Sequence, residues 1–177
     1  LITNTLIGLG IDIIDLGLST TPTVEIAVPL EKADGGIILT ASHNPKQWNA
    51  LKLLNSKGEF ISGDEGELIL ALAEKEEFNF VQIDELGTII KNDQLLKKHI
   101  NDCVNYKFVD IGAIKKAKFK IVVDAINSTG AIAVPALLKA LGVQDIMVIN
   151  EEVNGKFAHN PEPLSEHLTQ LSIEVVK

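Results

Sequence analysis

Arginine is absent from this chain of 177 residues: all 16 basic side chains other than histidine are lysines, against 24 acidic ones, and the formal charge is −8. Proteins that bind nucleic acid hold the phosphates with clusters of lysine and arginine. An acidic, arginine-free chain therefore argues against a nucleic-acid partner. The chain also lacks the planar, bidentate grip that arginine offers to a phosphate group.

Cysteine occurs once, as Cys103, which excludes an internal disulfide and a cysteine-cluster metal site. No apolar run approaches the roughly 20 residues that a membrane-spanning helix needs, and the first residues show no signal-peptide pattern. Hydrophobic residues make up 46% of the chain and aromatic residues 5%, which is ordinary for a globular protein. We expect a reducing, cytoplasmic setting and no membrane partner.

Both ends of the chain lie inside apolar patterns close to helical spacing. The apolar residues in these patterns are Leu1, Ile2, Leu6 and Leu9 at one end, and Leu168, Leu171, Val175 and Val176 at the other. A natural domain rarely begins or stops within a periodic segment. We therefore expect a fragment of a longer protein.

Between the ends, short β-rich runs alternate with helical patterns, which is typical of α/β architecture. The pattern predicts strands at 11–16, 37–40, 51–54, 121–123 and 146–149. Helix starts are predicted at Thr20-Thr21-Pro22, at the Ser62–Glu65 capping box and at Asp93. The predicted inner faces of the second and third helices are Leu68, Ile69, Leu72 and Ala73, and Leu96, Ile100, Cys103 or Val104, and Phe108. Residues 78–90 are less clear and are interpreted as an irregular or short-strand segment.

A lysine-rich stretch, 115–118, is interpreted as a linker between two units. The second unit reads as strand, loop, helix and strand, with Gly142 as the helix stop and Pro135 either inside a kinked helix or just after its start. We predict one domain over 1–114 and an incomplete second domain over 118–177. The predicted fold class is α/β, a three-layer α/β/α domain with a mixed sheet followed by part of a second domain of the same kind.

The stretch "GGIILTASHNPKQWNALKLLNSKG", residues 35–58, combines two apolar runs with polar residues between them. Taken singly, Ser42 and His43 are plain turn residues, Asn44-Pro45 ends a strand, and Lys52 is a solvated lysine. Taken together they indicate a site, because ligands of parallel α/β sheets bind beyond the carboxyl ends of the strands. Lys52 shares one face of its strand with Ala50 and Leu54, so its ammonium could reach the loop.

A serine hydrolase is the competing interpretation, but the Gly-x-Ser-x-Gly motif that such an enzyme needs at its nucleophile is absent. Neighbouring residues of an extended chain face opposite ways. We therefore expect Ser42 and His43 to be poorly placed to share a proton.

"TASHNP" followed by "NALK", with the lysine ten residues after the serine, resembles the active-site loop of the α-D-phosphohexomutases, which include phosphoglucomutase, phosphomannomutase and phosphoglucosamine mutase. "DLGLSTTPTVEIAV", "KIVVDAINSTGAIAVPALLKALG" and "GKFAHNPEPLSEHL" are similar to further segments of the same family. The resemblance covers nearly the whole chain. Ala50 stands where the family usually has glycine, and Trp48 where it usually has tyrosine.

The resemblance implies an isomerase that works as an intramolecular phosphotransferase. A phosphoserine at Ser42 passes its phosphoryl group to a hexose phosphate, and the sugar bisphosphate formed returns the other phosphate. Lys52 is implied as the general base, or alternatively as an electrostatic clamp, since a base needs a neutral amine that a nearby phosphate disfavours. His43 is implied as a proton carrier or a substrate contact, and Asn44 as a residue that shapes the loop and binds substrate.

The resemblance also implies Mg²⁺ as cofactor in the complete protein, held in part by the Ser42 phosphate, and hexose 1,6-bisphosphate as activator. The other metal ligands are expected after Lys177, so we expect the chain alone to be inactive. The preference among glucose, mannose and glucosamine phosphate stays open. Two other interpretations also stay open: a non-catalytic sugar-phosphate-binding module of the same fold, and a structural domain.

Three other motifs are interpreted as structural. His159-Asn160-Pro161 repeats the His-Asn-Pro order of the serine loop, but it precedes an acidic turn and is interpreted as a turn. "NSTG" at 127–130 follows a strand and opens a helix, where anions bind, yet it lacks a full phosphate-loop motif and is interpreted as a packing turn. Asp12 and Asp15 are strand-end residues with no ligand signature.

Overall fold

The computed structural model describes residues 1–44 and 47–177. In chain order the elements are α1 (Ile2–Gly8), β1 (Ile13–Asp15), α2 (Thr21–Leu30), β2 (Gly36–Thr40), β3 (Ala50–Leu54), α3 (Gly63–Lys75), the 3₁₀ turn η1 (Ile83–Glu85), β4 (Ile89–Lys91), α4 (Leu95–Val104), α5 (Ile111–Ala117), β5 (Lys120–Asp124), α6 (Gly130–Ala140), β6 (Asp145–Ile149), the 3₁₀ turn η2 (Ser165–His167) and α7 (Thr169–Val175). The α/β class is confirmed.

The described strands pair two by two. β1 pairs with β4 and β5 with β6, both parallel, whereas β2 pairs with β3 antiparallel. We had expected Ser42 to follow a strand of a parallel sheet, at the edge where such sheets bind ligands. This was wrong, because β2 and β3 are the two antiparallel strands of one hairpin. β4 overlaps the end of the segment 78–90, for which an irregular or short-strand structure was expected, and at three residues it is too short for alternation to show.

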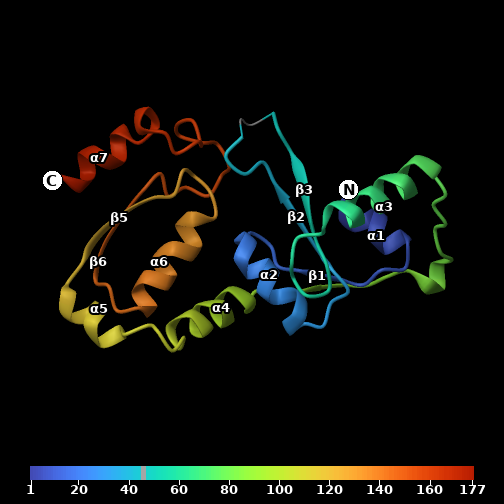
Figure 1. Ribbon diagram of the computed structural model, residues 1–177, viewed down its shortest axis with the longest axis horizontal. Helices are drawn as coiled ribbons and strands as arrows, with labels where there is room; N and C mark the ends of the chain where they lie inside the picture. Colours follow the sequence, from blue (N-terminus) through green and yellow to red (C-terminus); the bar gives the residue numbers. More distant parts are fainter. Residues whose placement is uncertain (45–46) are drawn as a thin grey trace.

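Figure 1 shows two groups of elements joined by α4. One group holds α1 to α3 with β1 to β4, and the other holds α5 to α7 with β5 and β6. Helix α4 packs against both α2 and α6, while α6 and α7 pack against the β5–β6 pair. The predicted boundary between domains at residues 114–118 stays a prediction.

The lysine-rich stretch is helical, so its interpretation as a linker was wrong. Asp110 caps α5 by accepting a hydrogen bond from the Ala113 amide, and the helix runs to Ala117. Lys115 and Lys116 occupy the last turn, where positive charge interacts favourably with the helix dipole. Lysines gather at the C-terminus of a helix as they do in exposed linkers, so composition did not distinguish the two.

Helix caps are partly as predicted. Thr20 caps α2 by accepting from the Thr23 amide, and Ser62 and Glu65 form the capping box of α3. Asp93 does not cap α4: the N-cap residue is Gln94, whose amide is bonded by the Asn92 side chain. Within 1–44 and 47–177, Asp93 accepts a hydrogen bond from the Gln94 side chain alone, because the helix starts one residue later than the sequence suggested.

The apolar face predicted for α3 is exposed to solvent, whereas the face predicted for α4 is half-buried except for Phe108. On α3, Leu68 is 66% and Leu72 is 62% exposed, and the helix makes at most marginal contact with the other described elements. Phe108, predicted on the inner face of α4, lies beyond its end and is 78% exposed. The helical period was correct for α3, but the packing partner was not deducible from it. Pro135 lies inside α6.

None of the helices in the described ranges is both long enough and apolar enough to cross a membrane.

Candidate functional site

The loop that follows β2 is positioned by a small core. Ile38 of β2 and Leu54 of β3 are buried against Val28 of α2. Directly opposed residues of an antiparallel pair point to the same side of the sheet. Since Lys52 opposes Ile38, it lies on the core-facing side of the hairpin, and its side chain is half-buried.

Ser42 stands two residues beyond the last residue of β2 and is exposed. Its backbone φ is +54°, in the left-handed region that few non-glycine residues adopt. The Thr40 hydroxyl accepts a hydrogen bond from the Ser42 amide at 2.8 Å, and the Ala41 carbonyl accepts one from the Asn44 amide at 3.0 Å. These bonds turn the chain sharply and present the Ser42 hydroxyl to solvent. The predicted turn at Asn44-Pro45 includes Pro45, which lies outside the described residues.

The expectation that Ser42 and His43 face opposite ways was wrong. The Ser42 hydroxyl oxygen lies 3.3 Å from Nδ1 of His43, which is at the outer range of a hydrogen bond. The reasoning assumed an extended backbone, whereas the left-handed conformation of Ser42 brings the two neighbouring side chains to one side.

The ammonium of Lys52 lies 5.6 Å from the centre of the Phe60 ring, in a cation–π geometry. Phe60 bridges to Leu54, farther along the hairpin from the loop. Among the hydrogen bonds of the described residues, the Ser42 hydroxyl meets His43 and not Lys52. The structure thus brings together two of the three groups expected to converge, and the roles of Ser42, His43, Asn44 and Lys52 stay predictions.

The side chains beside Ser42 do not by themselves suit a magnesium ion, which prefers carboxylate and phosphate oxygens. The groups placed at Ser42 are the Thr40 hydroxyl, which is bonded to the Ser42 amide, and the His43 imidazole, which lies beside the Ser42 hydroxyl. Within 1–44 and 47–177, no cluster of three or more histidine, cysteine, aspartate or glutamate side chains is arranged to hold a metal ion.

A second polar cluster lies at the carboxyl end of β5, and the sequence analysis passed over it. Asp124 accepts hydrogen bonds from the Ile126 amide at 3.1 Å and the Asn150 side chain at 2.9 Å, and its other oxygen lies 2.8 Å from Nε2 of His159. Nδ1 of His159 lies 2.8 Å from the Asn160 carbonyl. The Asn150 amide also donates to Gln170 at 3.1 Å. The turn interpreted from His159-Asn160-Pro161 thus carries an ion pair.

The two partners shift each other's pKa in opposite directions. The hydrogen bond to Asp124 raises the pKa of His159 above its usual value, against a smaller opposing effect of burial. Burial pushes the pKa of Asp124 upward, but the hydrogen bonds from Asn150, His159 and Ile126 together outweigh it and lower the pKa. Both shifts favour the charged forms of the pair.

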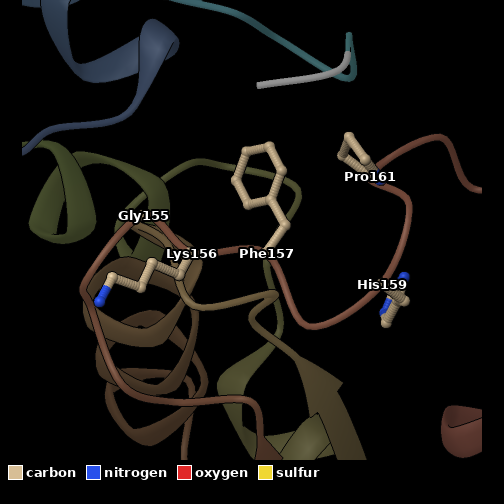
Figure 2. A pocket seen from close by; sticks show the side chains of 5 residues that line it. All are labelled: Gly155, Lys156, Phe157, His159 and Pro161. Carbon is tan, nitrogen blue, oxygen red and sulfur yellow. The ribbon is translucent and has the colours of Figure 1, made fainter. Parts of the chain in front are cut away.

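Beside this cluster a cavity of about 440 Å³ is lined by Gly155, Lys156, Phe157, His159 and Pro161 (Figure 2). It lies at the end of the parallel pair β5–β6 where such sheets bind ligands. The only sequence signal was the His-Asn-Pro repeat shared with the serine loop.

The "NSTG" loop keeps its interpretation as a packing turn. Ile126 and Asn127 both have positive φ, and the Asn127 amide donates to the Asn150 carbonyl at 2.7 Å. The loop therefore ties the ends of β5 and β6 together.

Asp12 is likewise structural: it accepts hydrogen bonds from the amide and the hydroxyl of Thr88, and these bonds lower its pKa.

Comparisons with known proteins match this α/β chain to two domains of one enzyme family. The family models described as "Phosphoglucomutase/phosphomannomutase, alpha/beta/alpha domain I" and "domain II" match residues 1–80 and 97–177. A phosphoglucomutase/phosphomannomutase of Thermococcus kodakarensis is 36% identical over 97% of this chain and 37% of its own length. A phosphoglucosamine/phosphogalactosamine mutase of Sulfurisphaera tokodaii is 34% identical, with the same coverage.

Among solved structures, a phosphoglucomutase/phosphomannomutase family protein of Burkholderia thailandensis matches with a TM-score of 0.76 and 25% identity, over 96% of this chain and 36% of its own. The chain thus spans a little over a third of the length of these relatives. The second family model begins inside α4, the helix that joins the two groups of elements.

Proposed function

Because the chain belongs to the phosphoglucomutase/phosphomannomutase family, we propose that it is part of an enzyme that moves a phosphoryl group between the 1 and 6 positions of a hexose phosphate. The proposal concerns the complete protein, since the relatives are almost three times as long as the stretch they share with this chain. Glucose, mannose and glucosamine phosphates are all candidate substrates.

The observation that carries the proposal is the exposed Ser42 hydroxyl in its left-handed turn. A phosphoryl group on this oxygen would point into solvent, clear of the core beneath β2 and β3. It would add a charge of roughly −1.5 to −2 near neutral pH. His43, 3.3 Å from the oxygen, is placed to donate a hydrogen bond to the phosphate.

In the proposed transfer, a hydroxyl oxygen of the hexose phosphate attacks the phosphorus on Ser42. The new O–P bond forms as the P–Oγ bond breaks. The proton of the attacking hydroxyl passes to a base, for which Lys52 is our candidate, and the released Ser42 oxygen takes up a proton to become a hydroxyl again. The reverse transfer from the other phosphate of the sugar bisphosphate restores phosphoserine. Lys52 would have to leave Phe60 to take this part, which a flexible four-carbon side chain allows. Magnesium and hexose 1,6-bisphosphate enter the proposal only for the complete protein.

Intact-mass spectrometry of the complete protein tests the proposal. We expect a species about 80 Da heavier, the mass of one phosphoryl group, which maps to Ser42 and disappears when hexose phosphate is added. Ser42→Ala should lose this species and lower phosphomutase activity by roughly 10³-fold or more, as for other catalytic nucleophiles. Ser56→Ala, at an exposed serine in the turn after β3, is the matched control and should change neither.

Two other results would favour a different function for the protein. Stoichiometric binding of hexose phosphate without phosphoserine would favour a non-catalytic sugar-phosphate-binding module. Lys52 held over Phe60 and away from Ser42 is the feature that favours this second candidate. Absence of both phosphoserine and sugar-phosphate binding would leave a structural role for the domain.

A further inference from the structure

Thr40 is the last residue of β2, and the hairpin fixes its place. Its backbone pairs with Ala50, the first residue of β3. Alternate residues of a strand share one face, so Thr40 lies on the same face as the buried Ile38. Lys52, which opposes Ile38, belongs to this face as well. The half-buried Thr40 side chain is therefore on the side of the hairpin that carries the proposed base.

The Thr40 hydroxyl is bonded to the backbone of Ser42. Its oxygen accepts a hydrogen bond from the Ser42 amide at 2.8 Å. A threonine oxygen bonded to the amide two residues later closes a turn in place of a backbone carbonyl. Among the hydrogen bonds within 1–44 and 47–177, the Ser42 amide donates to Thr40 alone. This bond brings the Ser42 backbone toward the face on which Lys52 lies.

The same bond supports an unfavourable backbone conformation. Ser42 has a φ of +54°, in the left-handed region, where the Cβ of a serine comes too close to the following carbonyl oxygen. Such a conformation persists only where the surroundings impose it. The other bond of the turn, from the Asn44 amide to the Ala41 carbonyl, spans Ser42 without involving it. Of the described side chains, Thr40 is thus the one bonded to the Ser42 backbone, in the conformation that places the Ser42 hydroxyl beside His43.

We propose that Thr40 is a positioning residue for phosphoryl transfer: its hydroxyl fixes the Ser42 backbone and so sets the direction of the Oγ atom that carries the phosphoryl group. The P–Oγ bond breaks as the bond from the sugar hydroxyl oxygen to phosphorus forms, and the two oxygens must lie roughly in line through phosphorus. A displacement on the order of 1 Å can slow such a step by about 10²-fold. The effect on the rate rests on the proposed function, whereas the effect on the turn does not.

Three variants of the complete protein separate the Thr40 oxygen from the shape of the side chain. Thr40→Val removes the acceptor and keeps the β-branched shape that suits a strand. Thr40→Ser keeps the hydroxyl and removes only the methyl group. Thr88→Val is the matched control, because it removes a threonine hydroxyl beside β4 that donates to Asp12 at 2.7 Å and does not touch Ser42.

Millisecond hydrogen exchange of the peptide that covers 41–44 measures the turn. Thr40→Val should raise the exchange of the Ser42 amide at least several-fold, because the bond that protects this amide is lost. Thr40→Ser and Thr88→Val should leave the exchange of this peptide close to that of the wild type.

Rapid-quench mass spectrometry measures the transfer itself. Phosphorylated protein is mixed with hexose phosphate, and the loss of the species about 80 Da heavier is followed in time. The rate of this loss and kcat should both fall about tenfold in Thr40→Val, with KM changed less than about threefold, because the substitution affects the transfer and not the binding of the sugar. Thr40→Ser should restore most of the rate, and Thr88→Val should keep it.

Unchanged exchange in Thr40→Val would overturn the inference, and so would faster exchange with an unchanged rate of transfer. Equal losses in Thr40→Val and Thr40→Ser would also overturn it, since they would assign the effect to side-chain shape. If faster exchange throughout the chain shows that Thr40→Val is unfolded, Thr40→Ala, which also lacks the oxygen, decides. A wild-type protein with neither phosphoserine nor phosphomutase activity refutes the proposed function, while the exchange result still decides whether Thr40 holds the turn.

Discussion

At the residue scale, the polar contacts that matter join parts of the chain distant in sequence. Asp124 and His159 are 35 residues apart. Thr23, the most deeply buried polar side chain among the described residues at 1% exposure, bonds His99 at 2.9 Å across 76 residues. Each of these histidines ties one helix or loop to another. In contrast, Ser42 and His43 are joined by a local turn that needs no distant partner.

The Asp124–His159 pair predicts a pH dependence of stability. The raised pKa of His159 means that its contribution is full below about pH 6.5, the unfolded value, and is lost as the pH rises through the folded pKa. The lowered pKa of Asp124 means that its contribution is present above about pH 3.9 and is lost as the pH falls further. The pair therefore stabilises most between these limits.

We expect His159→Gln to lower the free energy of unfolding of the complete protein by about 1.5–3 kcal/mol near pH 6, the usual range for a hydrogen bond to a charged group. The loss should be smaller at pH 9 than at pH 6, because the contribution of the charged histidine declines as the pH rises through its raised folded pKa. Urea denaturation at the two pH values measures it, with His167→Gln as control. An equal loss at both values would mean that the charge on His159 does not contribute.

At the element scale, two glycines with positive φ differ in what surrounds them. Gly58 and Gly17 both have positive φ, +78° and +61°. Gly58 is buried under α2, and a Cβ there would overlap the Glu25 carbonyl oxygen, whereas nothing lies within 4 Å of a Cβ at Gly17. The turn after β3 thus needs glycine for packing as well as for φ. It fixes the hairpin, and with it the Ser42 loop, against α2.

Gly58→Ala should accordingly destabilise the complete protein more than Gly17→Ala. Both substitutions carry the cost of alanine in the left-handed region, about 1 kcal/mol. Only Gly58→Ala adds overpacking, typically about 1–3 kcal/mol. Thermal unfolding of the two variants gives the difference directly, and equal midpoints would contradict the close packing of this turn on α2.

At the scale of the whole molecule, the chain exposes more surface than its mass predicts. Its accessible surface is 12,552 Å², against roughly 8,400 Å² for a compact monomer of 19.2 kDa. Part of the excess is apolar: α3 and the β2–β3 hairpin carry exposed residues such as Leu68, Leu72 and Leu39. A chain that buries so little is expected to be marginally stable by itself.

The 177-residue chain alone should therefore bind a hydrophobic dye such as ANS strongly, and it should show no hexose phosphate turnover with or without magnesium. The complete protein should bind little dye and be active. Dye fluorescence and a coupled phosphomutase assay on both proteins measure this. Robust activity of the isolated chain would refute the prediction that further ligands and surfaces are required.

Sequence patterns alone determined the features that depend on neighbouring residues. The α/β class, the caps at Thr20 and Ser62, and the strand–loop–helix–strand unit of the second half all follow from spacing and local hydrogen bonding. The serine loop was recognisable for the same reason. The bounds of short β4 and the helical structure of 115–117 were not predicted, because three residues carry no period and a lysine-rich helix end has the composition of a linker.

Tertiary structure alone decided which strands pair, which helix faces are covered and which distant side chains meet. The antiparallel hairpin β2–β3, the left-handed turn at Ser42 and the position of Lys52 over Phe60 could not be deduced from periodicity. Nor could the Asp124–His159 pair, since nothing in the intervening residues marks the two as partners. Local rules act over a few residues, whereas such contacts arise only when the packing of the chain brings its distant parts together.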